Sequence, residues 1–259
     1  MSVPARVAIL GAGNIGSGWA ALFAAHGASV TIFDPDPAAL TRARHALAIA
    51  RTLPVHPPAP REGELVAAAA LGEAVRGAEW VQESIPDVLA LKRNLLETLA
   101  DVLPPKALVA SSTSTLTPSA LADGLPFEKR LLVAHPLHPV YAVPIVELCG
   151  GPSMPARTLE RAASVMRSVG REPMVVRGEP PGLVAHRLTM ALLDEAARLV
   201  RAGAVTEAEL DRIVARGIAT GWIVAGAIGT EAIGAGTGSL PEDAWARAIA
   251  RVLAAAPPE

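Results

Sequence analysis

The sequence predicts an α/β fold in which a doubly wound parallel sheet is followed by a small all-helical domain. In the first two thirds of the chain, short apolar segments typical of strands alternate with segments whose apolar residues recur at helical spacing. In the last third only the helical pattern continues. The stretch 178–182, Gly-Glu-Pro-Pro-Gly, interrupts both patterns, so we expect one domain over 1–178 and a second over 182–259.

Composition and charge exclude several classes of protein. The 259 residues include 23 Lys and Arg against 25 Asp and Glu, and no dense basic run appears, so neither nucleic acid nor an anionic membrane is an expected partner. The single cysteine, Cys149, rules out an internal disulfide and suits a reducing cytoplasm. The late apolar stretch 222–233 is short and contains Glu231, so we expect a cytoplasmic protein without a membrane span.

The first expected strand, 6–10, leads into a glycine-rich motif with G-x-G-x-x-G spacing. Gly11 permits a tight turn, Gly13 lets a pyrophosphate approach the backbone, and Gly16 allows the following helix to pack closely on the strand. Free amide groups at the N-terminus of that helix, expected over 17–26, favour phosphate. The cofactor-binding residues predicted from this motif are Gly11, Ala12, Gly13, Asn14, Ile15 and Gly16.

A carboxylate at the end of the second expected strand, 28–33, indicates which nucleotide the motif takes. Asp34 follows the glycines at about the separation at which an acid meets the ribose hydroxyls of adenosine. The next residues, Pro35, Asp36 and Pro37, include no arginine, and a carboxylate repels a 2′-phosphate, so NAD is favoured over NADP. These features are typical of a Rossmann-type domain. A glycine-rich turn in an α/β protein that binds no nucleotide is the alternative.

The segments up to residue 178 continue the alternation of helices and strands. Further helices are expected over 38–52, 64–75, 88–103 and 154–169, with a short one that begins at Thr117 and Pro118. Further strands are expected over 79–83, 107–111, 131–134, 145–148 and 173–176. The proline-rich stretch 53–60 cannot continue a helix and is interpreted as a rigid connector.

The region beyond residue 182 carries helical signals alone. The first helix, expected over 183–200, is apolar on more than one side, so we expect it to be buried between partners. Capping boxes at 206–209 and 239–242 indicate where two later helices begin.

The candidate catalytic residues lie where parallel strands end, which is where the ligands of doubly wound sheets bind. His135 follows the strand 131–134, and Glu147 lies in the next strand. A histidine whose ring is held by a carboxylate can take a hydroxyl proton as hydride leaves carbon. Ser114, at the end of the neighbouring strand, can hydrogen-bond the reacting oxygen. Singly, each has a simpler explanation, since a histidine beside prolines is more often structural and a Ser/Thr cluster is more often a turn.

Taken together, these segments resemble the 3-hydroxyacyl-CoA dehydrogenase family, and most closely its branch of lambda-crystallin and L-gulonate 3-dehydrogenase. The resemblance covers nearly the whole chain and is carried by the stretches 11–20, 81–87, 111–115, 133–136, 143–148 and 182–188. It implies a Rossmann fold, NAD as cofactor, His135 as catalytic base, Glu147 as its partner and Ser114 as a substrate contact. It also implies that Glu83 lies beside the cofactor.

Two residues depart from the family pattern. The family usually has asparagine in His-Pro-x-Asn-Pro and in Gly-x-x-x-Asn-Arg, whereas this chain has His138 and His186. The resemblance places these two histidines, together with Ser112, near substrate or nicotinamide. In this family the C-terminal helices commonly form a dimer, so a homodimer is a candidate assembly.

The resemblance implies NAD-dependent oxidation of the hydroxyl of a 3-hydroxy acid. Relatives that use coenzyme A carry a longer helical extension where this chain has Pro54, Pro57, Pro58 and Pro60, so a small free acid is expected as substrate. A 3-hydroxyacyl-CoA thioester, as in fatty acid metabolism, is the alternative substrate.

Two further hypotheses compete with a dehydrogenase. The first is a non-catalytic NAD-binding or structural protein, because a fold does not fix a function. The second is a metal site formed by His135, His138, His186 and Glu147, although a His-x-x-His pair at a proline-rich strand exit has no established ligand geometry.

Overall fold

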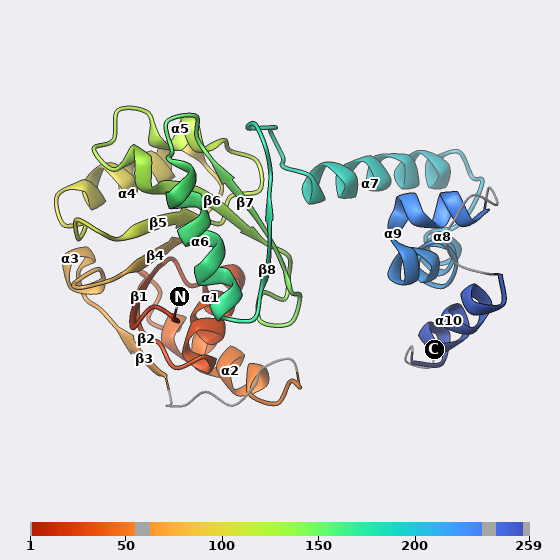
Figure 1. Cartoon of the computed structure of the whole chain (residues 1–259), viewed down its shortest axis with the longest axis horizontal. Helices are drawn as coiled ribbons and strands as arrows, with labels where there is room; N and C mark the ends of the chain where they lie inside the picture. Colours follow the sequence, from red (N-terminus) through yellow and green to blue (C-terminus); the bar gives the residue numbers. More distant parts are fainter. Residues whose placement is uncertain (1, 55–62, 235–241, 256–259) are drawn as a thin grey trace. The chain divides into compact units, whose positions relative to one another are not determined.

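The computed structural model describes residues 2–54, 63–234 and 242–255 (Figure 1). The chain divides into two compact units, Met1–Arg187 and Leu188–Glu259.

The first unit is built on one sheet of eight strands. Its spatial order is β3-β2-β1-β4-β5-β6-β7-β8, and every neighbouring pair is parallel except β6 and β7, which are antiparallel. This mostly parallel arrangement confirms the predicted Rossmann-type fold class. The strands are β1 (Arg6–Leu10), β2 (Ser29–Phe33), β3 (Glu64–Ala67), β4 (Trp80–Glu83), β5 (Leu108–Ser111), β6 (Leu131–Pro136), β7 (Ile145–Gly150) and β8 (Glu172–Val175).

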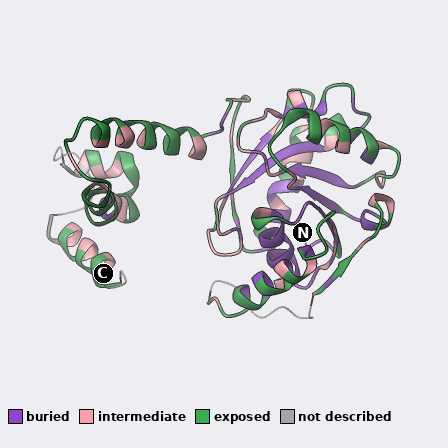
Figure 2. Cartoon of the chain, turned by 180° about the vertical axis from the view of Figure 1, so that it is seen from behind, coloured by how far each residue is buried: buried purple, intermediate pink, exposed green. Residues whose placement is uncertain are grey.

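Helices cover both faces of this sheet, because successive residues of each strand point to opposite sides. In β1, Val7 and Ile9 belong to one apolar cluster, whereas Ala8 and Leu10 belong to another. The first cluster contains α1 (Asn14–Ala25), α2 (Ala39–Ala50) and α6 (Ala156–Ser168). The second contains α3 (Leu71–Ala74), α4 (Leu89–Ala100) and α5 (Pro118–Ala122). Figure 2 shows the resulting core as buried strands between partly exposed helices.

The prediction of a helix over 64–75 is wrong. Residues Glu64–Ala67 form the edge strand β3, which pairs with β2, and only the short α3 follows it. Leu65 is buried while its neighbours in β3 are exposed, as in a strand with one buried face. The backbone hydrogen bonds offered by β2 outweigh the local helical spacing, which is ambiguous in so short a stretch. Residues 55–60 of the expected connector lie outside the described residues.

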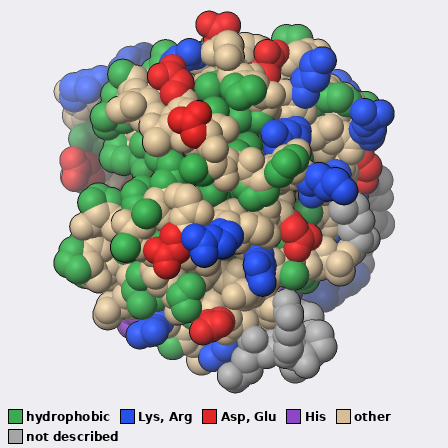
Figure 3. All heavy atoms as spheres, turned by 90° about the vertical axis from the view of Figure 1, so that its left-hand side faces the viewer, with side chains coloured by type: hydrophobic (Ala, Val, Ile, Leu, Met, Phe, Trp, Pro, Cys, Tyr) green, Lys and Arg blue, Asp and Glu red, His purple; other side chains and the backbone are tan. Residues whose placement is uncertain are grey.

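The predicted start of a short helix at Thr117 and Pro118 is confirmed. Thr117 caps α5 by accepting a hydrogen bond from the amide of Ala120, with Pro118 in the first position of the helix. A single turn of 3-10 helix, η1 (Glu128–Arg130), then leads directly into β6. Figure 3 shows one face of the molecule, where basic and acidic side chains are both spread among hydrophobic ones, in line with the balanced composition.

The second unit is helical, and α7 (Ala185–Arg201) leads into it from the first unit. It continues with α8 (Glu207–Ile213), the π-helical turn η2 (Val214–Ile218), α9 (Ala219–Gly234) and α10 (Glu242–Ala255). The capping box at Thr206 and Glu209 is confirmed, whereas the one expected at 239–242 lies mostly outside the described residues. No residue of α7 is buried among the described parts of the chain, so its burial against a partner stays a prediction.

Among the described residues, one helical stretch, Glu207–Ala232, could cross a membrane by its length and composition. It has 26 residues, and an 18-residue window within it has a mean hydropathy of 1.4. A single helix of this kind is weak evidence for a membrane protein, and Gly226 interrupts it with a left-handed φ of 72°.

Candidate active site

The glycine loop between β1 and α1 has the geometry that the motif predicts. Gly11 has a φ of +84°, and a side chain there would meet Ile85 at 2.8 Å. A Cβ on Gly16 would lie 1.9 Å from the carbonyl oxygen of Gly11, so only glycine allows this close approach of helix and loop. A Cβ on Gly13 would meet nothing within 4 Å. The loop is therefore tight where it packs and open where a pyrophosphate would lie, which fits a dinucleotide.

Asp34 is tied directly to the glycine loop. Its carboxylate accepts a hydrogen bond of 2.6 Å from the amide of Ala12 and another of 2.8 Å from the amide of Asp36. Asp34 therefore lies where an acid can meet an adenosine ribose.

An arginine of α2 reaches the same place through a contact that the sequence did not predict. Arg42 Nε donates to the carbonyl oxygen of Ala12 at 3.1 Å, and its guanidinium forms an ion pair with Asp36. The amide of Ala38 and the Arg42 side chain hold the pKa of Asp36 below its ordinary value. Helical position alone places Arg42 on an exposed side of the helix and does not show that its side chain turns back to the loop.

His135 and Glu147 form a buried pair in neighbouring strands. They lie directly opposite each other in the register of β6 and β7, and His135 Nδ1 is 2.8 Å from Glu147 Oε2. The two residues are 9% and 3% exposed. Because Nδ1 donates its proton to the carboxylate, the neutral ring carries an unprotonated Nε2, which is able to accept a proton.

The second oxygen of the Glu147 carboxylate holds the start of α7. Oε1 accepts hydrogen bonds from the amides of Val184 and Ala185 at 2.9 and 3.0 Å. The chain reaches this position through a left-handed turn, in which Gly182 has a φ of 81° and the buried Leu183 a φ of 49°. A left-handed leucine is unusual, and here it directs two successive amides at one carboxylate oxygen.

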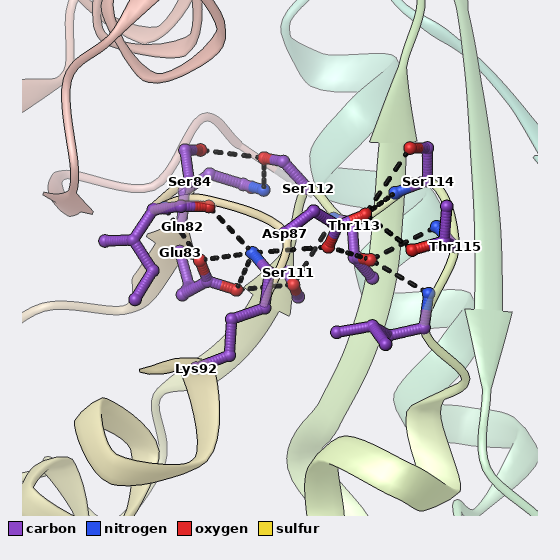
Figure 4. A network of polar contacts seen from close by, with 12 residues as sticks. Gln82, Glu83, Ser84, Asp87, Lys92, Ser111, Ser112, Thr113, Ser114 and Thr115 are labelled. Atoms are coloured by element: carbon purple, nitrogen blue, oxygen red, sulfur yellow. Dashed lines mark hydrogen bonds and ion pairs between the residues drawn. The ribbon is translucent and has the colours of Figure 1, made fainter. Parts of the chain in front are cut away.

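Asp87 organises the loop that carries Ser114 (Figure 4). Its carboxylate accepts hydrogen bonds from the hydroxyl groups of Thr113 and Thr115, the latter at 2.8 Å, and from the amide of Ser114 at 3.3 Å. Burial alone would raise the pKa of Asp87, but these hydrogen bonds and the charge of Lys92 lower it below the ordinary value. Among the described residues, the Ser114 hydroxyl bonds Asp87 at 3.5 Å and is not bonded to His135.

Glu83 lies behind this loop in a fully buried ion pair with Lys92, which sequence reasoning also missed. Lys92 Nζ lies 2.6 and 2.9 Å from the two carboxylate oxygens, and the Glu83 and Lys92 side chains are 0% and 1% exposed. The Ser111 hydroxyl donates to the same carboxylate (Figure 4). The amide of Ile85 donates to it as well. Both oxygens of Glu83 are thus occupied within the protein, and its predicted contact with the cofactor stays a prediction.

The other predicted site residues surround these groups. Ser112 Oγ accepts hydrogen bonds from Trp19 Nε1 at 3.1 Å and from Gln82 Nε2 at 2.9 Å. These bonds hold the Ser112 side chain directly after the C-terminal end of β5. His138 is exposed after β6, and His186 is half-buried in the first turn of α7. Within the parts of the chain that are described, no three His, Cys, Asp or Glu side chains are grouped so that they could hold a metal ion.

Comparison with known proteins places this site in a family. Residues 6–179 match the family model of the 3-hydroxyacyl-CoA dehydrogenase NAD-binding domain. The chain belongs to the 3-hydroxyacyl-CoA dehydrogenase family. The predicted resemblance to this family is therefore confirmed, and NAD is the cofactor of its first domain.

Curated relatives of this 3-hydroxyacyl-CoA dehydrogenase family member carry more specific names. The chain is 40% identical over 232 residues to an L-carnitine dehydrogenase/betainyl-CoA thioesterase of Ruegeria pomeroyi, with 88% of this chain and 48% of that protein covered. It is 37% identical to an L-carnitine dehydrogenase of Pseudomonas putida, with 88% and 72% covered. The chain thus spans about half the length of the first of these relatives.

Two solved structures are similar to this chain in fold. A 5-formyl-3-hydroxy-2-methylpyridine 4-carboxylic acid 5-dehydrogenase matches with a TM-score of 0.83 and 29% identity, over 98% of this chain and 81% of that one. The 3-hydroxybutyryl-CoA dehydrogenase of Escherichia coli K12 matches with a TM-score of 0.66 and 24% identity, over 79% and 44%. The second match shows the fold alone.

Proposed function

We propose that this protein oxidises the hydroxyl group of a free 3-hydroxy acid, with NAD as hydride acceptor and L-carnitine as the first candidate substrate. The observation that carries the proposal is the His135–Glu147 pair, in which the 2.8 Å contact at Nδ1 leaves Nε2 as an acceptor. The pair lies at the end of β6, in a sheet whose β1 end carries the glycine loop.

The residues of this chain account for the proton transfer. Oxidation of an alcohol removes a proton from oxygen and a hydride from carbon, and bound NAD supplies the acceptor for the hydride. His135 takes the hydroxyl proton at Nε2 and becomes an imidazolium. Glu147 keeps the ring oriented and stabilises this cation, because its carboxylate is already hydrogen-bonded at Nδ1. Ser114, on the loop held by Asp87, is the candidate contact for the substrate oxygen.

The names of the relatives change which free acid is tested first. The sequence alone suggested a substrate like L-gulonate, whereas the curated relatives are named L-carnitine dehydrogenase. Both compounds are small 3-hydroxy acids, so the expected class is unchanged. The sequence-based expectation that the prolines at 54–60 interrupt any long helical extension supports a free acid over a thioester.

Steady-state production of NADH from a panel of alcohols tests the proposal. The panel contains L-carnitine, L-gulonate, 3-hydroxybutyrate and 3-hydroxybutyryl-CoA, with the His135→Asn variant as control. We expect the highest kcat/KM for a free acid. A preference for the thioester would contradict the substrate class, and the absence of turnover with every compound would favour a protein that binds NAD without catalysis.

A further inference from the structure

A basic cavity lies at the end of the sheet where strands β5 and β6 begin, and the candidate active site lies at the other end of these strands. The volume of the basic cavity is about 380 Å³, and four cationic side chains line it: Lys106, Arg130, Arg157 and Arg161. Lys106 precedes β5 and Arg130 precedes β6, so the cavity lies where these strands begin, whereas Ser114 and His135 lie where they end. The candidate active site therefore does not use this cavity.

The charges around the basic cavity are not balanced by the described part of the protein. No acidic residue is among the described residues that line it. Elsewhere in the described chain, arginine and lysine side chains form ion pairs, as in Arg42 with Asp36 and Arg167 with Glu160. Over the same residues, none of the four cations of the basic cavity has a carboxylate within ion-pair distance. A bound anion would supply the missing countercharge.

Two of the guanidinium groups are fixed by the backbone, which makes the basic cavity a preformed site. Arg130 Nη1 donates to the carbonyl oxygen of Ala107 at 2.6 Å, and Arg161 Nη1 donates to that of Lys106 at 2.8 Å. Each guanidinium carries five N–H donors, so donors remain for a ligand. Burial and the nearby charge of Arg161 lower the pKa of Arg130, as expected for like charges that are held together.

The remaining lining residues add donors for an anion. Arg157 lies one turn before Arg161 in α6, so the two side chains project on the same side of the helix. Thr158 contributes a hydroxyl group to the wall. Both Arg157 and Thr158 belong to the first turn of α6, a helix of 13 residues whose N-terminus carries partial positive charge.

We propose that the basic cavity binds a small anion that carries two or more phosphate groups. Several arginine forks and a lysine around one cavity suit the bidentate hydrogen bonding and the high charge of such a ligand. A volume of about 380 Å³ is at the small end of ligand pockets, which suits pyrophosphate better than a complete dinucleotide.

Calorimetric titration of the whole protein with pyrophosphate tests the proposal. Because the glycine loop also binds a pyrophosphate group, each titration is run with and without saturating NADH. Inorganic phosphate serves as the second ligand, and sodium chloride keeps the ionic strength equal. We expect one pyrophosphate bound per chain, with an affinity that NADH does not change and that exceeds the affinity for phosphate at least tenfold.

Substitutions of the residues that line the basic cavity test whether pyrophosphate binds there. Arg157→Gln combined with Arg161→Gln removes two of the four charges, and we expect pyrophosphate affinity to fall about tenfold or more. Arg157→Gln alone changes only an exposed side chain and should give a smaller loss in the same direction. Arg167→Gln, on the same helix but paired with Glu160, is the matched control and should leave affinity within about twofold.

Four results would overturn the proposal. They are no binding of pyrophosphate by the unmodified protein, binding that NADH abolishes, affinity for phosphate equal to that for pyrophosphate, and unchanged affinity in both cavity variants. None of these results depends on dehydrogenase activity, so this proposal and the proposed function can fail separately.

Discussion

His135 and Glu147 face each other across the antiparallel pair formed by β6 and β7, with Nδ1 and Oε2 2.8 Å apart. Residues directly opposite in neighbouring strands project on the same face of a sheet, so this register alone brings together two side chains that are 12 positions apart in the chain. A parallel β7 would instead have needed a long crossover after β6. The reversal of strand direction at this point of the sheet is thus what builds the candidate catalytic pair.

The choice of nucleotide should depend on Asp34 and Arg42 together. Asp34→Ala removes the ribose acceptor and the charge that repels a 2′-phosphate, so affinity for NAD should fall about tenfold while affinity for NADP rises. Arg42, which already reaches the Ala12 carbonyl, is placed to meet that phosphate. Fluorescence titration with NADH and NADPH measures both affinities.

Arg42→Gln in the Asp34→Ala background is the matched test of this joint role. It should remove the gain for NADP and leave NAD affinity unchanged relative to Asp34→Ala. If the unmodified protein bound NADP more tightly than NAD, the role assigned to Asp34 would be wrong.

Asp87 should matter for substrate binding more than for the chemical step. Asp87→Ala frees the Thr113–Thr115 loop that carries Ser114, so KM for the hydroxy acid should rise about tenfold with a smaller change in kcat. Asp101→Ala, at the exposed C-terminal end of α4, is the control and should change neither parameter. An unchanged KM in the Asp87 variant would show that the loop is held by other contacts.

Because of the lowered pKa of Asp87, we expect the free energy of unfolding to depend on pH. The pKa of Asp87 is lower in the folded protein than its ordinary value of 3.8, so the ionised form stabilises the fold. This contribution is fully present above pH 3.8 and is lost as the pH falls through the lower folded-state pKa. Urea unfolding of the unmodified protein and of Asp87→Asn should therefore differ at neutral pH and converge in acid. A difference that grows in acid would have the wrong sign.

Substitutions of Glu147 should affect both kcat and the free energy of unfolding. Glu147→Gln keeps an acceptor for the amides of Val184 and Ala185 but no longer holds the ring of His135 in one tautomer, so kcat should fall about 10- to 100-fold with little loss of stability. Glu147→Ala leaves both amides without this acceptor and should lower the free energy of unfolding by about 1–3 kcal/mol. Equal unfolding free energies for the two variants would contradict the role of Glu147 at the start of α7.

Cys149 should be unreactive in the folded protein. Its thiol is buried in β7, and burial raises its pKa to about 11, so almost no thiolate is present at neutral pH. A thiol reagent at pH 8 should modify Cys149 slowly in the native protein and rapidly in urea. Rapid labelling of the native protein would contradict the burial of this thiol in β7.

The parts of the fold that depend on local signals could be predicted from the sequence. The strand, glycine loop, helix, strand and acid from Arg6 to Asp34 occur in the predicted order, because each turn has a residue type that its backbone requires. The errors concern pairing between distant segments. Residues Glu64–Ala67 form a strand because β2 has a free edge, which spacing within the segment cannot show.

The candidate site, like the fold, contains residues that could be predicted from the sequence and residues that could not. His135 and Glu147 could be found because they end or occupy strongly apolar strands. The contacts of Arg42, Asp87 and Lys92 could not be predicted, because each side chain reaches another segment of the chain. The position of Asp87, four residues beyond the end of β4 at the carboxyl edge, is a signal that could have revealed it.

The most direct test of the central claim is the turnover of His135→Asn with L-carnitine, followed as NADH production, alongside its affinity for NADH. We expect kcat to fall about a hundredfold or more, the usual effect of removing a general base, while NADH binds as it does to the unmodified protein. Near-normal turnover in this variant would contradict His135 as the base, and with it the mechanism proposed for this chain.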